Sequence, residues 1–311
     1  MSIITVTLNP AIDKTIYCDS FELGATNRIQ HVTEDIAGKG INVSKNLREH
    51  HLESTLVAVF AGHNGDRSYR FLIGENYDVV KIDAIGETRI NQKIVDKSGT
   101  TTELNEKGPS ITQDTIDDLY TWIKNNVKTD DIVILSGSLP QGAPTDIYGE
   151  IIRICHTLSA KTILDASGEC LVDAIKAKPF CVKPNDDEIQ TLLELDRKPT
   201  KEEMLVYGKQ LIQEGIEKVV ISLGKEGAYF IDKERILKGK GLELKSLSSV
   251  GAGDAMVSAL AYSFYHHETY DQIVKRAIAT SGAAVETEGT KPGKQSRVLE
   301  LMELVKIEKG A

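Results

Sequence analysis

Short apolar segments alternate with helical patterns through the last two-thirds of the chain, and this alternation constrains the fold most. The segments are rich in β-branched residues and lie at 131–136, 161–165, 180–183 and 218–222. Strands that are buried on both faces have this composition. Helical patterns follow near 144–158, 186–195, 201–215 and 254–266. Strand–helix alternation at this spacing predicts βαβ units, a parallel sheet and an α/β fold.

Two polar segments, 14–33 and 86–106, depart from this pattern. In the second one, apolar and polar residues alternate from Thr88 to Val95, and a turn at 97–99 precedes another extended stretch. Hairpins of an antiparallel sheet with one exposed face have this pattern. We therefore predict that both segments form a small β lid over the main sheet, within one domain that spans residues 1–311.

Composition excludes several classes of protein. A formal net charge of −9 and an aromatic content of 5% argue against nucleic-acid binding, which needs a basic surface and stacking side chains. No apolar run approaches the roughly 20 residues that span a bilayer. The N-terminal residues lack the basic segment of a signal peptide, and the four cysteines form no metal-binding spacing. We expect a cytoplasmic protein without a membrane or nucleic-acid partner.

Polar or glycine-rich residues follow four of the predicted strands. They lie at Ser136–Ser138, Asp165–Gly168, Lys183–Asn185 and Ser222–Lys225. Ligands of open α/β sheets bind outside the carboxyl ends of the strands. The sequence therefore predicts a binding site at this edge of the sheet.

The segment Gly251-Ala252-Gly253-Asp254 precedes an apolar helical stretch. Glycines at the start of a helix leave backbone N–H groups free to bind an anion, and the helix dipole adds positive potential. Asp254 would accept a proton from a hydroxyl that attacks a phosphoryl group. The alternative is that Asp254 only caps the helix. A dinucleotide motif is excluded, because Met256 replaces the third small residue of that motif.

A second glycine turn, Gly38-Lys39-Gly40-Ile41-Asn42, also leads into a helical pattern. Lys39 offers a cation to a phosphate, and Asn42 can form a hydrogen bond with a sugar hydroxyl. Taken alone, the turn is better interpreted as a solvated loop. Asp13, at the end of the first predicted strand, would bind two sugar hydroxyls or belong to an ordinary turn.

Asn185 and Glu188 lie three residues apart at a helix start, so their side chains share one face. Oxygen ligands at this spacing suit Mg²⁺, although Glu188 would equally complete a helix capping box. Arg28 and Arg89 fall in the two lid segments, where an arginine fork suits the phosphate of a substrate. The alternative for each arginine is a solvated surface position.

Together these segments resemble the ribokinase-like (PfkB) carbohydrate kinases, over almost the whole chain. The segments that carry the resemblance occur in order: Asn9-Pro10-Ala11-Ile12-Asp13, Gly38-Lys39-Gly40-Ile41-Asn42-Val43, Ser136-Gly137-Ser138-Leu139-Pro140, Lys183-Pro184-Asn185 with Glu188, Ser222-Leu223-Gly224, and Val250-Gly251-Ala252-Gly253-Asp254. Each segment alone is weak evidence for this family, whereas the occurrence of all of them in this order is highly specific. The first and third of these segments resemble the phosphohexose branch of the family. The resemblance implies a ribokinase-like three-layer fold with a mostly parallel central sheet.

The resemblance also implies a role for each candidate residue. Asp254 would be the catalytic base, with Gly251, Ala252 and Gly253 as the anion hole. Lys183 would contact ATP, Asn185 and Glu188 would organise Mg²⁺, and Ser222, Gly224, Lys225 and Gly227 would line the nucleotide site. Asp13, Gly38, Lys39, Asn42 and Ser138 would hold the sugar, and Arg28 and Arg89 its phosphate.

The implied activity is ATP-dependent phosphorylation of a ketohexose phosphate. Fructose 1-phosphate is the leading acceptor, as for a 1-phosphofructokinase, and tagatose 6-phosphate is the alternative. A non-catalytic sugar-phosphate sensor on the same fold is a third hypothesis, because fold alone does not fix function. The resemblance further implies a homodimer that forms through the lid.

Overall fold

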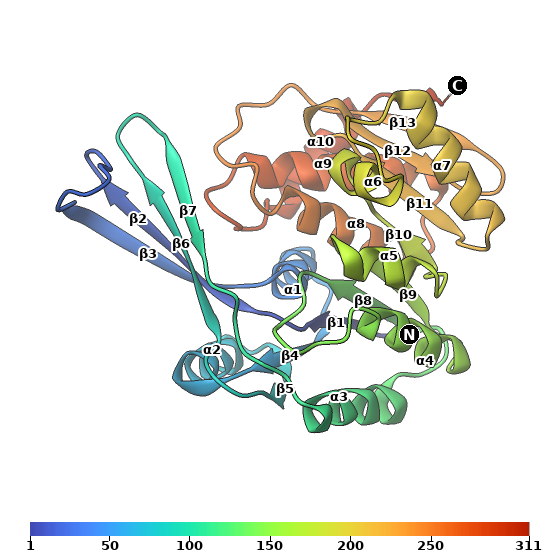
Figure 1. Ribbon diagram of the computed structural model, residues 1–311. Helices are drawn as coiled ribbons and strands as arrows, with labels where there is room; N and C mark the ends of the chain where they lie inside the picture. The colour runs from blue at the N-terminus through green and yellow to red at the C-terminus, as the bar shows by residue number, and fades with distance from the viewer. Residues whose placement is uncertain (311) are drawn as a thin grey trace.

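The computed structural model describes residues 1–310 and contains two separate β-sheets (Figure 1). In spatial order the main sheet contains β14 (Ile307–Lys309), β13 (Ile236–Lys240), β12 (Gly227–Ile231), β11 (Lys218–Ser222), β10 (Cys181–Val182), β9 (Lys161–Asp165), β8 (Ile132–Ser136), β1 (Ile3–Thr7), β4 (Thr55–Phe60) and β5 (Asp78–Asp83). Strands from β11 to β5 pair in parallel, and β11 to β14 pair antiparallel. The expected mostly parallel α/β sheet is confirmed.

Helices cover both faces of the main sheet. One face carries α1 (Lys39–Glu49), α2 (Gly62–Gly74), α8 (Ala252–Tyr265), α9 (Tyr270–Val285) and α10 (Gln295–Leu304). The other carries α3 (Gln113–Asn126), α4 (Ile147–Thr157), α5 (Glu169–Ile175), α6 (Asp186–Leu192) and α7 (Lys201–Gln213). Neighbouring residues of a strand point to opposite faces, so Val133 packs into the core under α4 and Ile134 into the core under α8. Burial on both faces explains the continuous apolar runs.

The second sheet projects away from the main sheet (Figure 1). Its strand order is β3 (Ile29–Ala37), β2 (Ala11–Cys18), β6 (Arg89–Val95) and β7 (Thr101–Asn105), and we call it the lid sheet. It extends further toward the main sheet than the segments 14–33 and 86–106, because β2 begins at Ala11 and β3 continues to Ala37. One face carries Asp13, Asn91 and Asn105, which are register partners on three strands.

Local sequence accounts for the helix starts near the site. α8 begins at Ala252, two residues before the range that periodicity predicted, because Gly251 ends the preceding loop with a φ of 83°. In α6, Asn185 occupies the N-cap position, and its side chain accepts a hydrogen bond from the Glu188 N–H at 2.8 Å. Among residues 1–310, no helix combines the length and apolar character that crossing a bilayer requires.

Candidate active site

A cavity of 590 Å³ lies between the carboxyl ends of the main-sheet strands and the lid sheet. The main sheet and the helices that cover it, which we call the main domain, contribute the start of α1, the end of β9, Lys183 and the start of α8. The lid sheet contributes Asp13, Arg89, Asn91 and Lys93. A cavity lined by charged side chains therefore lies at the sheet edge where the sequence predicts a binding site.

The N-terminus of α8 forms one wall of the cavity. Gly251, Ala252, Gly253 and Asp254 all line it. Gly251 is the N-cap and adopts the left-handed conformation, in which a Cβ atom would also approach Thr290 Cα to 3.2 Å. No side chain caps this helix, so its first backbone N–H groups are available to an anion. The interpretation of Asp254 as a helix cap is wrong.

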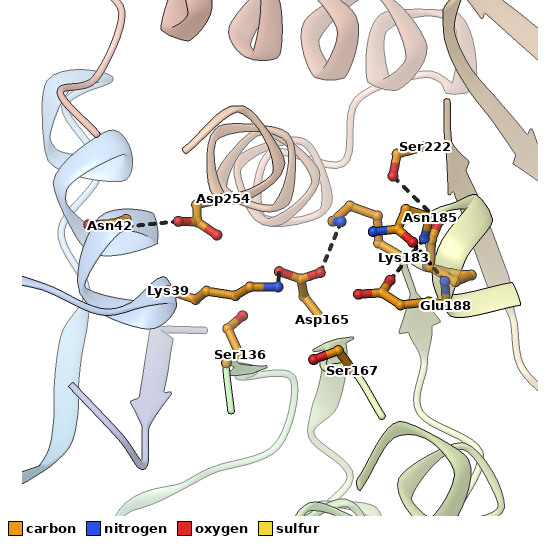
Figure 2. A network of polar contacts seen from close by, with 12 residues as sticks. Lys39, Asn42, Ser136, Asp165, Ser167, Lys183, Asn185, Glu188, Ser222 and Asp254 are labelled. Carbon is orange, nitrogen blue, oxygen red and sulfur yellow. Dashed lines mark hydrogen bonds and ion pairs between the residues drawn. The ribbon is translucent and has the colours of Figure 1, made fainter. Parts of the chain in front are cut away.

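Asp254 is 6% exposed and accepts a hydrogen bond from the Asn42 side chain at 2.8 Å (Figure 2). Burial, and then the charge of Asp165, raise the pKa of Asp254 to about 6. Lys39, Asn42 and Lys183 act in the opposite direction. A carboxylate with a pKa close to neutrality is suited to accept a proton from an alcohol and to release it again.

Asp165 lies at the centre of the site, although no role was predicted for it from the sequence. It lies at the end of β9, is 1% exposed, and stands between Lys39 at 3.1 Å and Lys183 at 2.9 Å (Figure 2). Burial alone would raise the pKa of Asp165, but the two lysines outweigh burial and lower the pKa to about 2. Asp165 in turn raises the pKa of Lys39. Asp165 and Lys39 therefore stay charged at neutral pH. The position of Asp165 after a strand was the only sequence signal.

Asn185 and Glu188 form a reciprocal capping box. The Asn185 backbone N–H donates to Glu188 Oε2 at 2.9 Å, and the Asn185 side-chain oxygen accepts from the Glu188 N–H. The capping alternative is thus what the structure contains, and Asn185 also lines the cavity. Burial, followed by the charge of Asp165, raises the pKa of Glu188. Among residues 1–310, no cluster of three or more histidine, cysteine or acidic side chains suits a metal ion.

The far end of the cavity contains Ser222, Gly224 and Gly227. Gly227 has a φ of 94°, and a Cβ atom there would lie 2.0 Å from the Gly239 carbonyl oxygen, so only glycine fits. Lys225, which the resemblance placed in the nucleotide site, is exposed and does not line the cavity. Its 3₁₀ turn, Gly224–Glu226, turns the lysine outward while the flanking glycines face the cavity.

Asp13 is held on the lid sheet by two neighbours on β6. Asn91 donates to Asp13 Oδ1 at 3.1 Å, and Lys93 Nζ lies 3.5 Å from Asp13 Oδ2. Asn91 and Lys93 line the cavity as well, and the sequence interpretation missed both. They were detectable in principle, because alternation places them on the same face of β6 as Arg89.

The remaining candidates divide into those inside and those outside the cavity. Gly38, Lys39, Asn42 and Arg89 line it. Ser138 does not, and instead its hydroxyl accepts a hydrogen bond from the Asn9 side chain at 3.4 Å. Arg28 is exposed and also lies outside the cavity, because the loop between β2 and β3 is at the opposite end of these strands from the main domain. Within one chain, the expected role of Arg28 on the substrate phosphate is not supported.

Comparison with known proteins identifies the family. Residues 6–297 match the model of the pfkB family carbohydrate kinases. The chain belongs to the pfkB family of carbohydrate kinases. This kinase is 33% identical over 307 residues to a 1-phosphofructokinase of Bacillus subtilis, covering 98% of this chain and 99% of the relative. It is 32% identical over 284 residues to a tagatose-6-phosphate kinase of Staphylococcus epidermidis, covering 89% and 90%.

Solved structures agree on the fold. A phosphofructokinase-2 of Escherichia coli, solved in complex with potassium, superimposes on this kinase with a TM-score of 0.92 and 25% identity, covering 97% of this chain and 98% of the other. The ribokinase-like expectation is confirmed. The kinase is an ATP-dependent sugar kinase.

Proposed function

We propose that this pfkB kinase transfers the γ-phosphoryl group of ATP to fructose 1-phosphate and forms fructose 1,6-bisphosphate. One observation carries the proposal: the buried Asp254 carboxylate adjoins the open N-terminus of α8 in a cavity whose lid wall carries Arg89 and Lys93. A base, an anion site and lid cations are the groups that a kinase for a phosphorylated sugar needs.

In this proposal Asp254 accepts the proton of the acceptor hydroxyl as that oxygen attacks the γ-phosphorus. The N–H groups at the start of α8 stabilise the charge that builds up on the transferred phosphoryl group. Lys39 and Lys183, fixed on Asp165, supply two further positive charges on the main-domain side of the cavity. Phosphoryl transfer depends chiefly on such positioning and charge neutralisation.

Glu188 would hold Mg²⁺ together with the phosphates of ATP. Its Oε2 accepts from the Asn185 N–H, whereas its other oxygen remains available on a side chain that lines the cavity. Burial and the charge of Asp165 raise the pKa of Glu188 more than Lys183 and Lys39 lower it, so a further cation beside this carboxylate would be stabilising. Mg²⁺ usually binds one or two carboxylates and retains several waters, so a single protein carboxylate suffices. Mg²⁺ would neutralise phosphate charge, and Asn185 would orient Glu188 through the capping box.

The phosphate of the acceptor would bind Arg89 at the root of the lid sheet. Asp13, held by Asn91 and Lys93, would accept hydrogen bonds from sugar hydroxyls. Tagatose 6-phosphate is the alternative acceptor, supported by the relative of that name. A non-catalytic sensor is a weaker explanation, because it would have no use for a buried base with a pKa of about 6.

A coupled assay of ADP release tests the proposal. We expect the highest kcat/KM for fructose 1-phosphate among fructose 1-phosphate, fructose 6-phosphate, tagatose 6-phosphate, fructose and ribose. A preference for tagatose 6-phosphate would select the alternative acceptor. Activity confined to the unphosphorylated sugars would refute the role of Arg89 and the whole phosphohexose assignment.

We also propose that two copies associate through the lid sheets. Apolar side chains are exposed on this sheet and its loop: Leu23, Ile29, Val32 and Leu104. An exposed apolar sheet face is stabilised when another surface covers it. Sedimentation equilibrium should give twice the monomer mass, and Val32→Asp should return the kinase to a monomer. A wild-type monomer at micromolar concentration would contradict the dimer.

A further inference from the structure

Asn9 connects three segments at the root of the lid sheet. It lies between β1 and β2 and is 5% exposed. Its side-chain NH₂ group donates to the carbonyl oxygens of Lys107 at 3.1 Å and Leu139 at 3.2 Å. Lys107 follows β7 of the lid sheet, and Leu139 follows β8 of the main sheet. One buried amide thus connects the lid sheet to the carboxyl edge of the main sheet.

The backbone of the same residue fixes Arg89. The Asn9 carbonyl oxygen accepts a hydrogen bond from Arg89 Nη2 at 3.1 Å. Arg89 Nε is buried and has no hydrogen-bond partner among residues 1–310. Burial lowers the pKa of Arg89, with Asp13 acting in the opposite direction, so the guanidinium is a desolvated cation that lines the cavity. Its orientation therefore depends on the Asn9 carbonyl.

The loop that contains Gly108 packs so closely against Asn9 that no side chain larger than that of glycine fits at position 108. Gly108 has a φ of 91°, and a Cβ atom there would lie 2.2 Å from Asn9 Oδ1. The same loop is also held independently of Asn9, because the Gln141 side chain donates to the Gly108 carbonyl oxygen at 2.8 Å. Gln141 does not line the cavity and its side chain bonds the loop rather than Arg89, so it provides a matched control.

We propose that Asn9 is a positioning residue that aims the Arg89 guanidinium at the phosphate of the sugar-phosphate acceptor. The inference rests on the proposed function, in which Arg89 binds that phosphate. The amide of Asn9 holds its own peptide group in place between Lys107 and Leu139, and the carbonyl of that peptide group holds Arg89. Side chains that cannot donate two hydrogen bonds, such as alanine, leave the carbonyl free to shift.

The test is a double-mutant cycle with Asn9→Ala, Arg89→Ala and the combined variant, assayed with fructose 1-phosphate and ATP. Asn9→Ala should raise the KM for fructose 1-phosphate about tenfold and leave kcat and the KM for ATP within about twofold. In the Arg89→Ala background the same substitution should have no further effect, because the residue acts through Arg89. Gln141→Ala should keep the wild-type KM values.

Three results would overturn the inference while leaving the proposed phosphate site intact. The first is an Asn9→Ala effect that persists undiminished without Arg89, and the second is an equal loss for ATP, since both indicate a structural role. The third is a Gln141→Ala variant that raises the sugar-phosphate KM as much as Asn9→Ala does. An Arg89→Ala variant with a wild-type KM would instead refute the proposed phosphate site, and the positioning role with it. If Asn9→Ala does not fold, Asn9→Ser, which keeps one donor, should show an intermediate KM.

Discussion

The Asn42 side chain donates a hydrogen bond to the Asp254 carboxylate at 2.8 Å, across 212 residues of sequence. Asn42 belongs to α1 and Asp254 to α8, and these two helices pack side by side on one face of the main sheet. The contact joins the glycine turn at residue 38 to the one at residue 251. It also favours the charged form of Asp254, the proposed base on which the first two predictions depend, against the burial that raises its pKa.

Asp254→Asn should lower kcat by about 10³-fold, within the range that a general base contributes, because an amide cannot accept the hydroxyl proton. Binding of ATP and of the sugar phosphate should change little, since the amide has nearly the same shape. Single-turnover kinetics and calorimetric titration measure the two quantities. Turnover close to that of the wild type would show that another group is the base.

The kcat/KM for the sugar phosphate should fall as the pH drops through about 6. The pKa of Asp254 is raised to about 6, and only the deprotonated carboxylate can accept a proton. Asn42→Ala removes a hydrogen bond that favours the charged form, so the acidic limb should move to higher pH. A pH–rate profile of both proteins checks this, and a limb that stays in place or moves down would disprove the coupling.

Asp165→Asn should destabilise the folded kinase by roughly 3 kcal/mol at neutral pH, because it leaves buried Lys183 without its counter-charge. Lys39 is more exposed and should contribute little to this loss. The variant should also raise the KM for ATP, since neither lysine remains fixed. Urea denaturation and steady-state kinetics measure these effects. As a control, Asp173→Asn, which removes only exposed contacts to Lys176 and Thr145, should be nearly neutral.

His50 should make the protein less stable as the pH falls from about 7 to about 5. Burial, and then the charges of Arg276 and His51, lower the pKa of His50 from 6.5 to about 4. In this window the unfolded chain binds a proton that the folded chain excludes, so the free energy of unfolding decreases. The contribution amounts to about 2 kcal/mol. Denaturant melts of wild-type and His50→Gln protein should show a smaller pH dependence for the variant, and parallel curves would refute the assignment.

Much of the fold was predictable from the sequence because buried parallel strands leave a local signal. The apolar runs before Ser136, Asp165 and Ser222 each form a strand, and the polar residues after them gather at one edge. The lid hairpin from Arg89 to Asn105 was equally visible from its alternation and turn.

The contacts within the site were not predictable in the same way. Nothing local to Asp165 shows that two lysines from distant segments meet it, and the Asn185–Glu188 spacing fits a capping box as well as a metal ligand pair. Arg28 and Arg89 both lie in polar lid segments of the sequence. Only the direction of the strands places Arg89 at the root of the lid sheet and Arg28 at its far end.

The two walls of the cavity belong to sheets with no hydrogen-bonded strand in common. Asp13, Arg89 and Lys93 stand on the lid sheet, while Asp254 and Lys183 stand on the main domain. In the proposed function, the arginine for the acceptor's phosphate and the groups for phosphoryl transfer therefore belong to different sheets. Under that proposal, substitutions on the inner face of the lid sheet would change which sugar is accepted, within a lineage or in the laboratory, without altering the groups that handle the nucleotide.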